Sequence, residues 1–157
     1  MTPEKIIKII SITLSGFFFY FSYLVIESIY PISFKSFEDM YFLSIMIIFA
    51  IAIVLFYKRK KTGWFLLVVC FSYFAITAID VLIYYAKLGF YGVNVFSVYN
   101  FLSSPITHML TLVFFVGIIG VISRKNIRSV YSINGRTVIY TILIATIVGT
   151  LFFEYYT

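Results

Sequence analysis

The chain has 157 residues, of which 62% are hydrophobic, 22% are aromatic and 11% are charged. A soluble domain with this composition would leave far too much apolar surface in water, so the composition excludes an ordinary soluble protein and predicts that lipid is the solvent. The net charge of +6 does not indicate nucleic acid, because the cations lie at the ends of apolar stretches, where membrane topology and anionic lipid account for them.

Five long apolar stretches predict an all-α fold, that of a polytopic integral membrane protein. A hydrocarbon core of about 30 Å requires roughly 20 helical residues for each crossing. We therefore expect residues 1–157 to form one compact bundle of about five transmembrane helices. The predicted spans lie near residues 6–30, 40–57, 63–86, 105–123 and 137–156.

Local signals mark where these helices begin and end. Pro31 removes a backbone donor and ends the first span. Ser104 followed by Pro105 is typical of a helix start. Asn134 and Gly135 indicate a turn before the last span, which Thr137 can cap. Each apolar stretch is thus bounded by residues that favour a helix end.

Basic residues alternate between the loops in a way that predicts orientation. Ten of them lie before the first span, between the second and third, and between the fourth and fifth; only Lys35 and Lys87 lie in the other loops. The positive-inside rule then places the N-terminus in the cytoplasm. Trp64, next to the cluster of residues 58–61, is predicted to anchor the third span at headgroup depth.

The stretch from residue 88 to residue 103 lies between the third and fourth spans. It has no charged residue, and large apolar groups alternate with Gly and Asn. It is too polar to cross the membrane and too apolar for a free loop. We expect an interfacial or re-entrant segment.

Three ionisable residues remain inside the predicted spans: Asp80, Glu27 and His108. The predicted orientation places all three toward the outer leaflet. Asp80 is the most informative, because a carboxylate at that depth costs about 2.5 to 3.5 kcal/mol unless it is protonated or paired. The sequence therefore indicates an intramembrane polar site around Asp80.

Helical spacing places Thr77, Asp80 and Tyr84 on one face of the third span. Similar polar stripes occur on the first and fourth spans, and we expect the three stripes to share one interior, with the second span facing lipid. Two interpretations of this site remain open. It binds a cation or protons from outside, or, as we prefer, it is a structural network in which Thr77 or Tyr84 lies within hydrogen-bonding reach of Asp80.

Small residues predict close helix packing. Thr141, Ala145 and Gly149 recur every four residues on the last span and form a ridge that permits a close helix contact. Gly117 and Gly120 on the fourth span are a candidate partner surface. We expect the ridge to pack inside the bundle, with an interface between copies of the chain as the alternative.

The sequence shows no catalytic group, metal site or cofactor motif. Cys70 is the single cysteine and lies within a span, which favours a packed, inert thiol. The one His and the carboxylates lack the close spacing of metal ligands. A hydrolase built from Ser104, His108 and Asp80 would need a defined oxyanion hole, which the sequence does not indicate.

These observations favour a small non-enzymatic membrane protein that binds a partner or serves as a subunit of a larger complex. A small transporter or oligomeric pore that uses the site at Asp80 is the alternative, and a membrane-embedded enzyme acting on lipid is the third hypothesis. The expected partners are the bilayer and either another membrane protein or further copies of the chain. The abundance of Ile, Phe, Tyr and Lys favours a bacterial inner membrane as its location.

Overall fold

The computed structural model describes residues 2–29, 37–87 and 105–156, without the side chains at positions 21, 24–29, 37–42 and 151–156. The described residues contain no strand and five long helices: α1 (Pro3–Ile29), α2 (Phe37–Tyr57), α3 (Lys61–Lys87), α5 (Pro105–Ile122) and α7 (Gly135–Tyr156). Each helix begins and ends within one turn of its predicted range, so the all-helical class is confirmed. The predicted interfacial segment at residues 88–103 lies outside the described residues.

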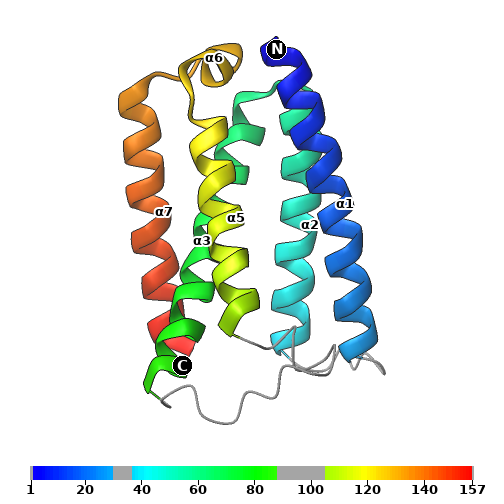
Figure 1. Ribbon diagram of the computed structural model, residues 1–157, viewed down its shortest axis with the longest axis vertical. Coiled ribbons are helices and arrows are strands. Elements are labelled where there is room, and N and C mark those ends of the chain that lie inside the picture. Colours follow the sequence, from blue (N-terminus) through cyan, green and yellow to red (C-terminus); the bar gives the residue numbers. More distant parts are fainter. Residues whose placement is uncertain (1, 30–36, 88–104, 157) are drawn as a thin grey trace.

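The bundle is organised around α3 (Figure 1). This helix packs against α2, α5 and α7, whereas α1 packs mainly against α2. Aromatic rings form the centre of the core. Phe115 of α5 stacks on Phe71 and Phe74 of α3, with ring centroids 5.4 and 5.1 Å apart. Phe17 of α1 meets the edge of Phe115 at 5.6 Å, so one ring joins three helices.

The position of α2 corrects part of the expectation that it faces lipid, because one face is buried in the bundle while Leu43, Ile47 and Ile51 on another are exposed. It lies between α1 and α3 and buries Phe49, Ala52 and Phe56. The Phe49 ring lies 5.7 Å from both Phe71 and Phe74. Burial of α2 thus follows the shape of its aromatic and small side chains, whereas the prediction relied on its lack of polar groups.

A tight turn joins α2 to α3. Arg59 has a φ of 57°, in the left-handed region, and its N–H donates to the carbonyl of Phe56, while the N–H of Lys60 donates to that of Leu55, both at 2.9 Å. These two bonds are those of a Schellman motif, which satisfies the last carbonyls of a helix. Gly63 then lies directly against the α2 backbone at Leu55 and Phe56. A Cβ atom at position 63 would overlap that backbone.

A short cap that the sequence did not predict follows α5. It consists of α6 (Lys125–Arg128) and the 3-10 helix η1 (Ser129–Tyr131). The buried hydroxyl of Tyr131 donates to the Phe56 carbonyl at 2.9 Å, and its ring stacks on that of Phe56 at 5.0 Å. Burial raises the pKa of the Tyr131 phenol, although the charge of Arg59 partly opposes this, so the hydroxyl keeps the proton that it donates.

Trp64 lies under the same cap and is fully buried. Its indole N–H donates to the carbonyl of Ile122, the last residue of α5, at 3.0 Å. This corrects the prediction of an interfacial anchor. The reason is that the last carbonyls of α5 have no partner within their own helix, and the indole supplies a buried donor.

The start of α7 also differs from the prediction. The side-chain oxygen of Asn134 accepts hydrogen bonds from both the backbone N–H and the hydroxyl of Thr137, each at 2.8 Å. Asn134 is therefore the N-cap, a role that asparagine fills well. The helix consequently begins at Gly135, before Thr137.

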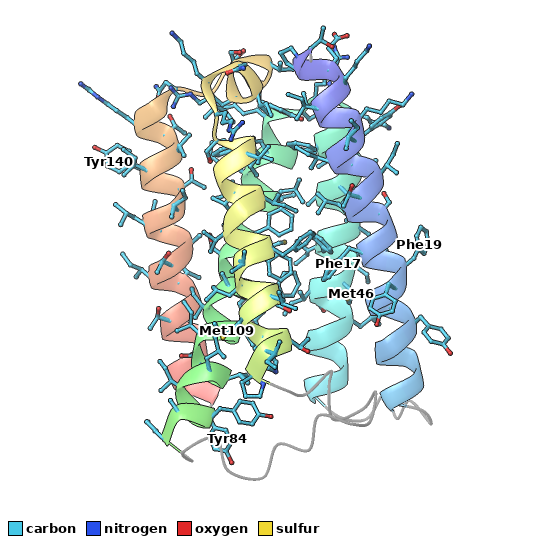
Figure 2. The ribbon with its side chains drawn as sticks, in the orientation of Figure 1. Phe17, Phe19, Met46, Tyr84, Met109 and Tyr140 are labelled. Carbon is cyan, nitrogen blue, oxygen red and sulfur yellow. The ribbon has the colours of Figure 1, made fainter. Side chains whose placement is uncertain are left out.

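The basic stretches, far apart in sequence, meet at one end of the bundle. The N-terminus of α1, the α2–α3 turn, α6 and the start of α7 all lie there, and their nitrogen-tipped side chains project from this capped end (Figures 1 and 2). Glu4 pairs with Arg59 at 2.8 Å between two exposed side chains, a contact that water and salt weaken.

The flanks of the bundle are apolar. Phe19 of α1 and Tyr140 of α7 point outward on opposite sides of the view (Figure 2), and both, like Met109 of α5, are more than half exposed. Among the residues that the structure describes, the helices α3 and α5 are long and apolar enough to cross a membrane. A third such segment exists if Lys125–Tyr131 and Gly135–Thr150, which meet at 87°, count as one span.

Candidate functional site

A groove of about 270 Å³ runs along one flank of the bundle, between α2 and α7 and over α3. We call it the α2–α7 groove. Its position follows from the packing, because α2 and α7 each lie against α3, on either side of the groove. Its lining is apolar apart from a thiol and a phenol, and consists of Ile45, Ile48, Val69, Cys70, Tyr73, Ala145, Val148 and Gly149.

The small-residue ridge of α7 forms one wall of this groove. Ala145 and Gly149 are buried against the bundle. A Cβ atom at Gly149 would lie 2.6 Å from Cδ1 of Ile76 on α3, so the missing side chain lets α7 approach α3 closely. The hydroxyl of Thr141 donates to the Thr137 carbonyl at 2.8 Å within α7. The ridge therefore packs within the bundle, against α3.

Gly117 and Gly120 do not oppose this ridge. Both are exposed on α5, and a Cβ atom at either position would meet nothing within 4 Å. Because α7 packs against α3, the two glycines remain on an open face.

The predicted polar face of α3 lies farther along that helix than the groove, and none of its three residues lines the groove. Tyr73 lines the groove, and Thr77, Asp80 and Tyr84 follow it on the same helix face at spacings of four, three and four. The Thr77 hydroxyl donates to the Tyr73 carbonyl at 3.1 Å, a bond that threonines in helices commonly make. The expected bond from Thr77 to Asp80 is therefore not made.

Asp80 is half-buried and Tyr84 is exposed. Within residues 2–29, 37–87 and 105–156, the structure records no hydrogen bond or ion pair to the Asp80 carboxylate. Asp80 thus lies on α3 about two turns beyond the last groove residue of that helix, Tyr73, away from the capped end and without a partner in the described part of the chain.

His108 lies on a different side of α3. Its ring is 6.4 Å from that of Tyr85. Tyr85 follows Asp80 by five residues, which corresponds to about 140° around a helix of 3.6 residues per turn. The structure therefore places His108 and Asp80 next to different faces of α3.

The polar face of α1 points away from the bundle. Tyr20 and Tyr23 are both exposed, while Phe17 and Phe18 of the same helix pack inward. The side chain of Glu27 lies outside the described residues. The three polar stripes consequently do not share one interior. On α1 the phenylalanine face packs against the bundle, where the tyrosine face was expected.

Sequence reasoning missed the groove itself. Cys70 is buried, in keeping with a packed thiol, but it also lines the groove, and nothing in the pattern of α2 marked Ile45 or Ile48. Two sequence features belong to the groove, the small-residue ridge on α7 and Tyr73 on α3. No local sequence pattern shows that these two features lie side by side. In the described part of the chain, no three His, Cys, Asp or Glu side chains are grouped to hold a metal ion.

The described residues thus define an all-helical bundle with apolar helices that could cross a membrane and with an open groove on its flank. No protein-family model, curated protein or solved structure matches the chain.

Proposed function

We propose that the chain is an integral membrane protein, located in a bacterial inner membrane, whose five long helices cross the bilayer with the capped end in the cytoplasm. Its exposed apolar flanks suit a hydrocarbon solvent. The basic side chains gathered at the capped end support the orientation, since the positive-inside rule counts Lys and Arg near the ends of spans.

The topology is testable by cysteine accessibility in a Cys70→Ser background. In intact cells, a membrane-impermeant maleimide should label the Asn94→Cys variant and should label the Lys60→Cys variant only after permeabilisation. Lys60 is exposed in the α2–α3 turn, so a lack of labelling would reflect the membrane barrier. Labelling of the Lys60→Cys variant from outside would overturn the orientation.

Within the membrane, we propose a non-enzymatic role: the protein is a subunit that binds a partner along the α2–α7 groove. The groove is the observation that carries this proposal, because it is an apolar recess on the flank of the bundle, accessible from the plane of the bilayer. Ile48 and Val148, which line it, are both exposed and offer apolar surface to a partner. A transport site shared by Asp80 and His108 has less support, since the two lie next to different faces of α3.

A pair of valines provides a matched test of this role. Val148 lines the groove and is 51% exposed, whereas Val116 lies on α5 and is 53% exposed. A photoreactive amino acid at position 148 should give one discrete protein adduct in native membranes, and the same group at position 116 should not. The adduct mass, compared with that of the chain, distinguishes a second copy from another protein. Equal adducts at both positions, or none at position 148, would contradict the role of the groove.

A further inference from the structure

We propose that the start of α7 binds an anionic phospholipid, with Arg128 and Arg136 holding its phosphate and the outer face of α7 lying along an acyl chain. This site is at the capped end of the bundle, separate from the α2–α7 groove. It rests on the proposed location in a membrane and does not require the partner-binding role of the groove.

Two arginines gather at the start of α7 and lack an acidic partner. The guanidinium of Arg128 lies against Gly135, where its Nη1 would be 2.7 Å from a Cβ atom, and the next residue, Arg136, is exposed. Residues 105–153 contain no Asp or Glu. In the part of the chain that the structure describes, neither arginine side chain has a hydrogen bond or an ion pair. Guanidinium groups donate paired hydrogen bonds to phosphate, so this position favours a phosphate group.

The basic cluster on the nearby α2–α3 turn is different. Arg59 pairs there with Glu4 at 2.8 Å, and Nζ of Lys61 lies 5.8 Å from the centre of the Phe65 ring. Two of the four cations in that turn therefore already have a partner within the chain. The arginines at the start of α7 are the better site for an external anion.

The face of α7 that begins at Arg136 is otherwise apolar. Four side chains follow Arg136 at positions i+3, i+4, i+7 and i+11 and share its face. Each is more than half exposed: Ile139, Tyr140, Leu143 and Ile147. We call these four residues and Arg136 the α7 strip. Figure 2 shows Tyr140 pointing away from the bundle, near the end from which the basic side chains project. The strip is about 16 Å long, which matches one leaflet of a hydrocarbon core about 30 Å thick.

The order of charge and apolar surface along α7 selects a lipid. A soluble polyanion would cover the arginines and leave the rest of the strip exposed, whereas an apolar helix would cover the strip and leave two guanidinium groups unpaired. A phospholipid carries a phosphate at one end and an apolar chain at the other, and tyrosine is favoured at the boundary between them. The net negative charge of an anionic headgroup adds attraction that a zwitterionic headgroup, with its own cation, does not supply.

Quenching of tryptophan fluorescence by brominated lipids tests this site on the full chain in vesicles. The Tyr140→Trp variant places a fluorophore on the α7 strip, and the signal of Trp64, measured in the unaltered chain, is subtracted. Brominated phosphatidylglycerol should quench position 140 more strongly than brominated phosphatidylcholine at equal mole fraction. We expect a preference of about 25-fold in binding, because each cation near the headgroups contributes about fivefold.

Tyr84→Trp is the matched control. Tyr84 is 61% exposed and Tyr140 is 62% exposed, and the two lie toward opposite ends of the bundle (Figure 2). Asp80 and Lys87 share the face of α3 that carries Tyr84, so one negative and one positive charge offset each other there. The two brominated lipids should therefore quench position 84 equally.

Substitution of the arginines tests their role. Arg136→Gln should reduce the preference at position 140 about fivefold, and the double variant with Arg128→Gln should abolish it. Lys87→Gln removes one charge at the opposite end of the bundle and should leave the preference unchanged. Arg136 is exposed, so its single variant remains informative even if the double variant fails to fold. Equal quenching of position 140 by the two lipids, or a preference that Arg136→Gln leaves unchanged, would overturn the proposal.

Soluble competitors separate a lipid from other anions. Glycerol 3-phosphate and polyglutamate should both leave the quenching at position 140 unchanged. Relief by glycerol 3-phosphate would indicate a site for free phosphate, relief by polyglutamate would indicate an acidic protein partner, and either would overturn the lipid site. If neither brominated lipid quenched position 140, the α7 strip would not face lipid, and the proposed membrane location would fail with it. Photo-crosslinking at position 148 tests the groove independently.

Discussion

Gly63→Ala should lower the free energy of unfolding by about 3 kcal/mol, because the new Cβ atom would overlap the backbone of α2 rather than a flexible side chain. The overlap occurs at Leu55 and Phe56, so α2 and α3 must move apart at the turn that joins them. Unfolding of the purified protein in mixed micelles, followed by circular dichroism, measures the effect.

Gly117→Ala is the matched control for this variant. A Cβ atom at Gly117 meets nothing within 4 Å, and alanine favours a helix over glycine by up to about 1 kcal/mol. We therefore expect Gly117→Ala to be neutral or slightly stabilising. Equal losses of stability in the two variants would show that helix propensity, and not the contact with α2, governs both positions.

Phe115→Ala should have a similar or larger effect, a loss of about 3 to 5 kcal/mol. The ring is buried and contacts Phe17, Phe71 and Phe74. Its removal leaves a cavity where three helices meet. In a bilayer the loss comes mainly from dispersion contacts that no lipid chain replaces inside the bundle.

Phe19→Ala is the corresponding control, since Phe19 is 71% exposed on α1. Lipid or detergent would contact either residue at that position, so the change in unfolding free energy should stay within about 0.5 kcal/mol. If Phe19→Ala destabilised the protein as much as Phe115→Ala, the ring cluster would not be the centre of the core.

Most of the helical framework could be predicted from the sequence, because a long apolar stretch in lipid has one local solution, a helix that satisfies its own backbone. The cap could not be predicted. Its buried residues Ile127 and Tyr131 are too few to give a periodic pattern, and the partner of Tyr131 is the carbonyl of Phe56, 75 positions away in the chain. The role of Trp64 was missed for the same reason, since its acceptor is 58 positions away.

The sequence predicted which residues of the candidate site share a face of α3, but not which neighbouring helix that face meets. The spacing of Thr77, Asp80 and Tyr84 predicts one shared face on α3, the helix that contains all three. Which neighbour that face meets depends on how α2, α5 and α7 are arranged around α3, and this arrangement is set by side-chain shape. The stacking of Phe115 on α3 directs His108 to a different side, an outcome that polarity alone did not indicate.

The buried bonds of Tyr131 and Trp64 give the bundle a pivot at its capped end. The Tyr131 bond ties the cap to α2, and the Trp64 bond ties α3 to α5. The helix α7 also begins at that end, beside the cap. A helix of 22 residues is about 33 Å long, so a tilt of α7 by about 5° around its first residue would move its last turn by about 3 Å. Such a tilt would change the width of the α2–α7 groove at Val148 and Gly149, which lie far along α7 from the capped end.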